Sequence, residues 1–180
     1  MKKRSNISQM AIIGVIAAVI CILGPLSIPI GVVPVSFTNL AIYFALYTLG
    51  MKKGTVSYIV YMLIGLVGIP VFSGFSGGPA KIIGPTGGYL IGFIFMAMIG
   101  GFFINKFIDK WYLCFAGMVL GTAVCYVFGT AWLAHQAHMS LGAAFSVGVI
   151  PFLPGDLVKI LIAAFAGPQI RKQLVRAGLF

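Results

Sequence analysis

The sequence has very few acidic residues: Asp and Glu together number two in 180 residues, against twelve Lys and Arg. Charged residues make up 8% of the chain, whereas soluble domains average about 25%. The chain is 61% hydrophobic, with a mean hydropathy of +1.11. A soluble fold of this length could not bury so much apolar surface, so we expect the lipid bilayer to be its solvent.

The scarcity of carboxylates also limits the chemistry that the chain can perform. Acid–base hydrolysis has few candidate residues and no nucleophile–base pair stands out, so we expect no catalytic residues and no enzymatic activity. The three cysteines, Cys21, Cys114 and Cys125, lie in apolar runs without metal spacing and are interpreted as small buried hydrophobic residues. His135 and His138 have no Cys, Asp or Glu nearby. We therefore expect neither a metal site nor a cofactor.

Six apolar segments follow one another along the chain. They cover roughly residues 8–23, 36–50, 54–69, 87–104, 111–132 and 154–166. At about 20 residues per membrane-spanning helix, this length allows six spans with short loops. We predict an all-α integral membrane protein with a single six-helix bundle over residues 1–180. The apolar stretch 141–152 either extends the sixth span or forms a short outer helix.

The basic residues indicate how these spans are oriented. With a cytoplasmic N-terminus, ten of the twelve basic residues lie on the cytoplasmic side: Lys2, Lys3, Arg4, Lys52, Lys53, Lys106, Lys110, Arg171, Lys172 and Arg176. Positive charge concentrates on that side of membrane proteins. We therefore predict two cytoplasmic termini in a multi-pass protein of the cell membrane, and no nucleic-acid partner. Only Lys81 and Lys159 fall elsewhere.

Asp156 and Lys159 are charges within the last apolar segment. A charge inside a span costs roughly 2.5–3.5 kcal/mol on insertion scales and marks a candidate functional site. Residues three apart share a helix face, so we expect the two side chains to meet. One interpretation is a ligand site, in which Asp156 accepts hydrogen bonds and Lys159 donates them. The alternative is an ion pair that only packs the bundle.

Residues 68–92 form a glycine-rich segment between the third and fourth spans, with eight glycines in 25 residues. Exposed backbone at membrane depth is tolerated only against protein or a water-filled cavity. We predict an outer lid or wall over a ligand, with Gly77, Gly78, Gly87 and Lys81 among its contacts. The alternative is an ordinary flexible connector.

Polar residues at the outer ends of two other spans are further candidates. Ser36, Thr38 and Asn39 open the second span, and Tyr89 begins the fourth. They can contact a ligand, or they can serve as interhelical hydrogen-bond donors and an interfacial tyrosine.

The first span carries small residues at fourth positions, Gly14 and Ala18, and Ala17 and Cys21. Such spacing permits close helix approach. It suits docking of another membrane subunit or packing within this chain.

Four sequence stretches together resemble one family. They are Gly68-Ile-Pro-Val-Phe72, Gly77-Gly78, Gly84-Pro-Thr-Gly-Gly-Tyr-Leu-Ile-Gly-Phe93 and Leu153-Pro-Gly-Asp-Leu-Val-Lys159. In order and spacing they look like the BioY family, the biotin-binding S components of energy-coupling factor (ECF) transporters. The family's usual Thr-Leu-Gln-Thr after the proline of span two reads Ser36-Phe-Thr-Asn39 here, without the glutamine.

The resemblance implies high-affinity capture of biotin from outside a bacterial cytoplasmic membrane. It also implies two kinds of partner, a membrane coupling protein docked on the small residues of span one and two cytoplasmic ATPases. Asp156 would accept from a ureido N–H, Lys159 would donate to a carbonyl or carboxylate, and Tyr89 would cover the rings. Alternatives are an S component for another vitamin and a small intramembrane enzyme that uses Asp156.

Overall fold

Seven helices and one short two-stranded ribbon form the part of the chain that the computed structural model describes, residues 6–29 and 33–177. The helices are α1 (Asn6–Leu23), α2 (Thr38–Leu66), α3 (Pro79–Ile83), α4 (Gly87–Lys106), α5 (Trp111–Gln136), α6 (Leu141–Gly148) and α7 (Leu153–Arg176). The strands β1 (Ser27–Ile28) and β2 (Val35–Ser36) pair antiparallel, with Ser27 opposite Ser36. The predicted domain of residues 1–180 extends beyond the described part and stays a prediction.

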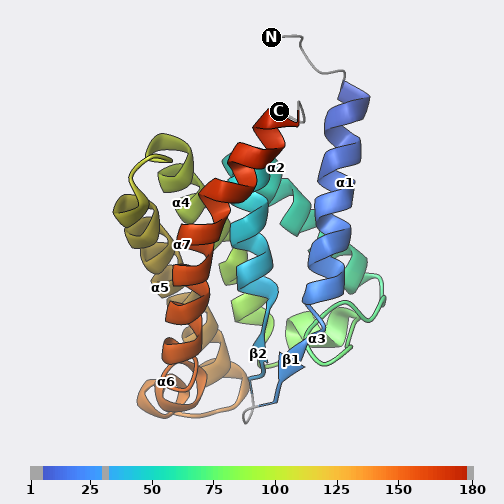
Figure 1. The fold of residues 1–180 in the computed structure, drawn as a ribbon. Coiled ribbons are helices and arrows are strands. Elements are labelled where there is room, and N and C mark those ends of the chain that lie inside the picture. The colour runs from blue at the N-terminus through green and yellow to red at the C-terminus, as the bar shows by residue number, and fades with distance from the viewer. Residues whose placement is uncertain (1–5, 30–32, 178–180) are drawn as a thin grey trace.

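Three of the described helices, α4, α5 and α7, are long and apolar enough to cross a membrane, and α1 contributes a shorter apolar run, Ile7–Leu23. The expected second and third spans both fall within α2. This helix is interrupted at Gly50, whose φ of 76° and ψ of 176° are open essentially only to glycine. A Cβ added at Gly54 would lie 3.0 Å from Leu46 Cδ2, so the arms before and after Gly50 fold back on each other (Figure 1).

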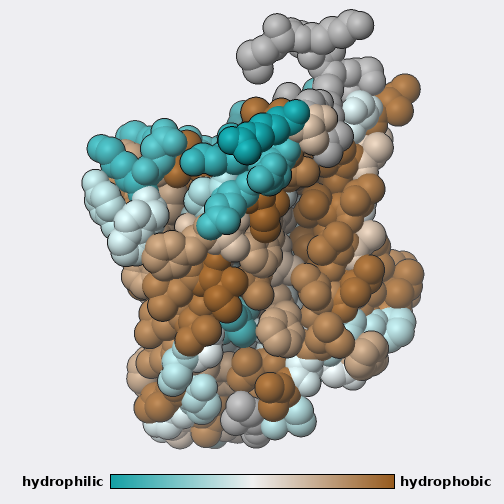
Figure 2. Space-filling view, in the orientation of Figure 1, coloured by the Kyte–Doolittle hydropathy of each residue, from teal (hydrophilic) through white to brown (hydrophobic). Residues whose placement is uncertain are grey.

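The two ends of the bundle differ in composition. The first turn of α1 and the last turn of α7 lie at one end, whereas the ribbon, α3 and α6 lie at the other (Figure 1). Figure 2 shows hydrophilic side chains gathered over the end where α7 finishes, above a broad hydrophobic band. Lys2, Lys3 and Arg4, which entered the orientation argument, lie outside the described residues.

Glycines allow α4 and α5 to approach closely. A Cβ on Gly92 would lie 3.0 Å from Cys125 Cα, and one on Gly121 would lie 2.9 Å from the Met96 carbonyl oxygen. Small residues at such contacts let helix backbones approach in membranes, where van der Waals packing drives association. The close contact fixes the relative positions of the residues that α4 and α5 contribute to the site.

The apolar stretch 141–152 forms a helix of its own. Ser140 caps α6, since its side-chain oxygen accepts a hydrogen bond from the Ala143 N–H at 3.3 Å. The chain then turns through residues 149–152 before α7 begins at Leu153. The short-helix alternative is therefore confirmed, and the stretch does not extend the last span.

Candidate functional site: a cavity around a buried ion pair

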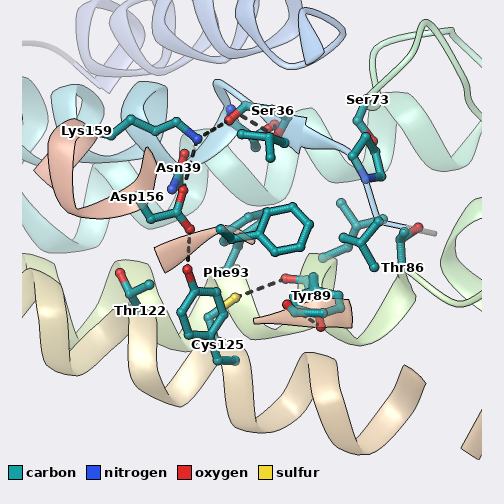
Figure 3. A pocket seen from close by; sticks show the side chains of 18 of the residues that line it. Ser36, Asn39, Ser73, Thr86, Tyr89, Phe93, Thr122, Cys125, Asp156 and Lys159 are labelled. Atoms are coloured by element: carbon teal, nitrogen blue, oxygen red, sulfur yellow. Dashed lines mark hydrogen bonds and ion pairs between the residues drawn. The ribbon is translucent and has the colours of Figure 1, made fainter. Parts of the chain in front are cut away.

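A cavity with about 680 Å³ of empty space, counting its open mouth, lies among the second, fourth, fifth and seventh helices. Ligand pockets are typically concave and largely apolar, with a few convergent polar groups. Its polar lining residues are Ser36, Thr38, Asn39, Tyr61, Ser73, Lys81, Thr86, Tyr89, Thr122, Tyr126, Asp156 and Lys159. Figure 3 shows several of these groups, among them Ser36, Asn39, Tyr89, Asp156 and Lys159, directed toward one space from different elements.

Asp156 and Lys159 meet at this cavity, as the spacing predicted. Lys159 Nζ donates to Asp156 Oδ1 at 3.0 Å, and the two residues are only 9% and 8% exposed. Lys159 Nζ also donates to the Ser36 carbonyl oxygen at 2.7 Å. A lysine ammonium has three N–H donors. Two of them make the hydrogen bonds to Asp156 and Ser36. The pair is therefore tied to β2, just before α2, and both of its residues line the cavity.

The second carboxylate oxygen of Asp156 is held from α5. Tyr126 donates its hydroxyl to Asp156 Oδ2 at 2.6 Å (Figure 3). One turn earlier, the Tyr43 and Thr122 hydroxyls lie 2.5 Å apart, and Thr122 donates to the Met118 carbonyl at 2.9 Å. Sequence reasoning missed Tyr126 and Thr122, because no pattern in an apolar span distinguishes a polar side chain that faces a cavity from one that packs.

The polar residues at the start of α2 all line the cavity. Ser36 donates from its hydroxyl to the Thr38 hydroxyl oxygen at 3.0 Å, and Asn39 Oδ1 accepts from the Leu40 N–H at 3.0 Å. Thr38 and Asn39 are buried. The Ser36 and Asn39 hydrogen bonds are local, whereas the Thr38 side chain also contacts the Tyr61 side chain on the second arm of α2. Both the ligand role and the interhelical role that we considered for these side chains therefore stay open.

Tyr89 stands in the cavity wall on the first turn of α4. Its hydroxyl donates to the Gly148 carbonyl oxygen at 2.9 Å, and its ring rests directly on Gly129, where any Cβ would overlap it. The ring is thus available to cover a ligand, while the hydroxyl ties α4 to α6.

The part of the glycine-rich segment that precedes α4 contributes three side chains to the cavity: Ser73, Lys81 and Thr86. Lys81 is half-buried and forms no ion pair among the described residues. Burial lowers its pKa, because desolvation penalises the charged ammonium. Gly77, Gly78 and Gly87 are not among the lining residues, so their role as ligand contacts stays a prediction.

Two donors from the end of α5 hold this segment in place. Trp132 Nε1 donates to the Gly84 carbonyl oxygen at 2.9 Å, and the Gln136 side chain donates to the Ile83 carbonyl. The segment therefore covers one side of the cavity as an attached wall. A freely connecting loop would not need such attachments.

The small residues of α1 divide between two faces. Ala17 is buried at 1% exposure and Cys21 is half-buried, so they pack within the bundle. Gly14 and Ala18 are exposed, and a Cβ on Gly14 would have no atom within 4 Å. Of these four small residues, only Gly14 and Ala18 are accessible to a partner protein.

Residues 1–176 match the model of the BioY family. The chain belongs to the BioY family. Among its relatives, the biotin transporter BioY of Thermotoga maritima is 37% identical over 164 residues, which is 88% of this chain and 93% of the relative. Biotin transporter BioY2 of Lactococcus lactis subsp. cremoris is 30% identical and spans 96% of this chain and 94% of its own length.

A solved structure gives the same result for the fold. The crystal structure of the S-component for biotin from an ECF-type ABC transporter superposes with a TM-score of 0.85 at 31% identity, covering 94% of this chain and 95% of that one. The BioY resemblance inferred from the motifs is thus confirmed. Family membership and the apolar helices indicate a multi-pass membrane protein of a transporter family.

Proposed function

We propose that this BioY-family protein binds biotin in the cavity around Asp156 and Lys159 and delivers it for uptake as the substrate-binding component of an ECF transporter. The observation that carries the proposal is this polar pair, buried in the wall of a cavity lined by further polar groups. The curated relatives are biotin transporters, and the superposed structure is a biotin S-component. We propose no enzymatic step and no cofactor.

Biotin's functional groups match the lining. Its ureido ring offers two N–H donors and one carbonyl, and its valerate chain ends in a carboxylate. Asp156 accepts from a ureido N–H, and Lys159 donates to the ureido carbonyl or to the carboxylate. Lys81, unpaired in the described structure, offers a second cation. The Tyr89 ring covers the bicycle, while Ser36, Thr38, Asn39 and the backbone near Gly77, Gly78 and Gly87 complete the contacts.

We also propose the orientation that the charges favour, six spans with both termini in the bacterial cytoplasm and the cavity opening outward. The Gly50 turn separates two spans within α2 and supports this count. The basic end of the bundle then faces the cytoplasm, in line with the positive-inside rule.

The partners are a membrane coupling protein and two cytoplasmic ATPase subunits. The open Gly14 and Ala18 face of α1 suits close docking of another helix, while Ala17 and Cys21 support it from within. Lipid covers the remaining apolar surface, which includes exposed Val15 and Ile22 on the same helix.

Calorimetric titration of the purified protein tests this function. We expect saturable binding of biotin and flat titrations with thiamine and riboflavin. A flat biotin titration of well-folded protein would overturn the proposal. Saturation by thiamine or riboflavin in its place would indicate an S component for another vitamin, and turnover of the bound ligand would indicate an intramembrane enzyme.

The same assay locates the two ends of the ligand. In Lys159→Ala, we compare biotin with its methyl ester, which lacks the carboxylate charge. If Lys159 contacts the carboxylate, the variant loses affinity for biotin more than for the ester. Equal losses would show that Lys159 does not contact the carboxylate.

A further inference from the structure

Tyr126 is a residue of the cavity wall that contacts the Asp156 carboxylate from another helix. It lies on α5, thirty positions from Asp156, and its hydroxyl donates to Asp156 Oδ2 at 2.6 Å. Hydrogen bonds to a charged acceptor are short and roughly twice as strong as neutral ones. The contact is therefore a strong constraint on how the carboxylate is oriented.

The carboxylate is held at both oxygens. Lys159 donates to Oδ1 at 3.0 Å and also donates to the Ser36 carbonyl oxygen, while the Tyr126 hydroxyl donates to Oδ2. A carboxylate has about four lone-pair positions. Both oxygens therefore keep acceptor capacity, and the two anchors decide which way it points.

A second cavity shows which other orientation of the Asp156 carboxylate the hydrogen bond from Tyr126 prevents. A mostly apolar groove of about 330 Å³ lies between α5 and α7, and its lining includes Val119, Leu157 and Ile160. Thr122, Tyr126 and Asp156 line both this groove and the ligand cavity. They form a thin partition between the two spaces. A carboxylate turned toward the groove would lose its polar partners in an apolar region, which is costly at membrane depth.

We propose that Tyr126 is a positioning residue for ligand binding: its hydroxyl fixes the Asp156 carboxylate so that the free acceptor positions face the ligand cavity and not the groove between α5 and α7. This inference rests on the proposed function, because the group received by the carboxylate is a ligand N–H. Tyr126 acts on the ligand through Asp156. Removing the Tyr126 hydroxyl must therefore change the Asp156 carboxylate as well as the ligand affinity.

The test uses Tyr126→Phe, which keeps the ring and removes only the hydroxyl. We expect biotin affinity in calorimetry to fall by about tenfold or more. Infrared spectroscopy of protein labelled with ¹³C-carboxyl Asp provides the second measurement. The chain has two acidic residues, and Asp109→Asn leaves Asp156 as the only labelled side chain. Its carboxylate band should shift in Tyr126→Phe even without ligand.

Tyr58→Phe is the matched control. Tyr58 is fully buried and donates to the Leu90 carbonyl at 2.7 Å, away from Asp156. We expect the Asp156 band to be unchanged and the biotin affinity to stay within about twofold, even if stability falls. The comparison separates the loss of a buried tyrosine hydroxyl in general from the loss of this one.

Three results would overturn the inference while leaving biotin binding intact: unchanged affinity in Tyr126→Phe, an unchanged Asp156 band, or the same band shift in the control. Absence of biotin binding by the wild-type protein would instead contradict the proposed function. If Tyr126→Phe does not fold, solid-state NMR of wild-type protein labelled at Asp Cγ and Tyr Cζ can detect the contact directly. We expect an Asp–Tyr cross-peak that Asp156→Asn removes, and its absence would overturn the inference.

Discussion

At the scale of single residues, the site depends on a charged pair in a region with few other charges. The described structure contains one salt bridge, between Lys159 and Asp156, and both residues have further partners on other elements. Removing one partner of a buried pair typically costs about 3–5 kcal/mol, because the remaining charge is left without compensation. Replacing both by neutral residues is often far less destabilising.

We therefore expect Lys159→Met to be less stable than the double variant Asp156→Asn, Lys159→Met. The single variant leaves Asp156 charged, with Tyr126 as its remaining hydrogen-bond partner among the described residues. Both variants should lose high-affinity biotin binding. Thermal unfolding in detergent without ligand measures the difference. If the double variant unfolds at a lower temperature than Lys159→Met, the expectation is wrong. The pair then stabilises the fold through interactions other than the neutralisation of one charge by the other.

The pair was predictable from sequence, but its surroundings were not. Spacing alone places Asp156 and Lys159 on one helix face. The hydrogen bond from Lys159 to the Ser36 carbonyl spans 123 positions, and it depends on how α7 docks against β2. The Tyr126 contact likewise depends on the rotation of α5. Such contacts are set by packing, which hydropathy does not encode.

At the scale of helices, the cavity wall depends on the absence of side chains at particular positions. The ring of Tyr89 occupies the space over Gly129 on α5 and approaches Gly148 at the end of α6. This arrangement fixes an aromatic ring beside the ligand space. The absence of a side chain at Gly129 leaves room for the Tyr89 ring, which comes from the first turn of α4.

Gly129→Ala should displace the Tyr89 ring, since an added Cβ overlaps it. We expect weaker biotin binding, by about tenfold, together with a destabilisation of about 1–3 kcal/mol typical of overpacking. Gly142→Ala is the matched control, because a Cβ there meets no atom within 4 Å. Titration and thermal unfolding of both variants check this. Equal behaviour of the two would contradict the proposed role of Tyr89.

The attachment of the glycine-rich wall predicts an effect on kinetics. Trp132→Phe removes the N–H that holds the Gly84 carbonyl and retains an aromatic ring. We expect faster biotin dissociation with a smaller change in association, measured by stopped-flow or surface plasmon resonance. The control is Trp111→Phe, at the other end of α5, where the ring centroids of Trp111 and Phe165 lie 5.3 Å apart. This variant should leave the dissociation rate unchanged. An unaltered rate in Trp132→Phe would show that the wall does not control ligand release.

Helix positions were largely predictable, because long apolar runs bounded by glycine and proline set them. The expected fourth segment, 87–104, lies within α4, and the fifth, 111–132, lies within α5. Hydropathy left the division between α6 and α7 open, although Pro151 and Pro154 favoured a break. The turn through residues 149–152, which contains Pro151, makes this break before α7 begins at Leu153.

At the scale of the whole molecule, polarity is distributed along the bundle axis. Figure 2 shows the hydrophilic residues concentrated at one end and a hydrophobic band below it. The ligand cavity lies toward the other end, where the ribbon and α3 are found (Figure 1). A protein that captures a ligand outside and releases it inside needs this separation of its two ends.

The orientation predicts which positions react with a membrane-impermeant maleimide in intact cells. In a background with Cys21, Cys114 and Cys125 replaced, a cysteine at exposed Gly142 should be labelled from outside. One at exposed Lys52 should be labelled only after the cells are permeabilised. The reverse pattern would invert the proposed topology. Labelling of both positions from outside would contradict the predicted number of spans.

The anchoring of Lys159 to Ser36 also has a consequence for biosynthesis. The two partners are separated by 123 positions, so the ribosome takes roughly 6–25 s to add the intervening residues at about 5–20 residues per second. During that interval the earlier helices are in the membrane without their final polar partner. Nascent or truncated chains that lack α7 should therefore be unable to retain the vitamin, and biotin capture would report that α7 has been synthesised and has docked.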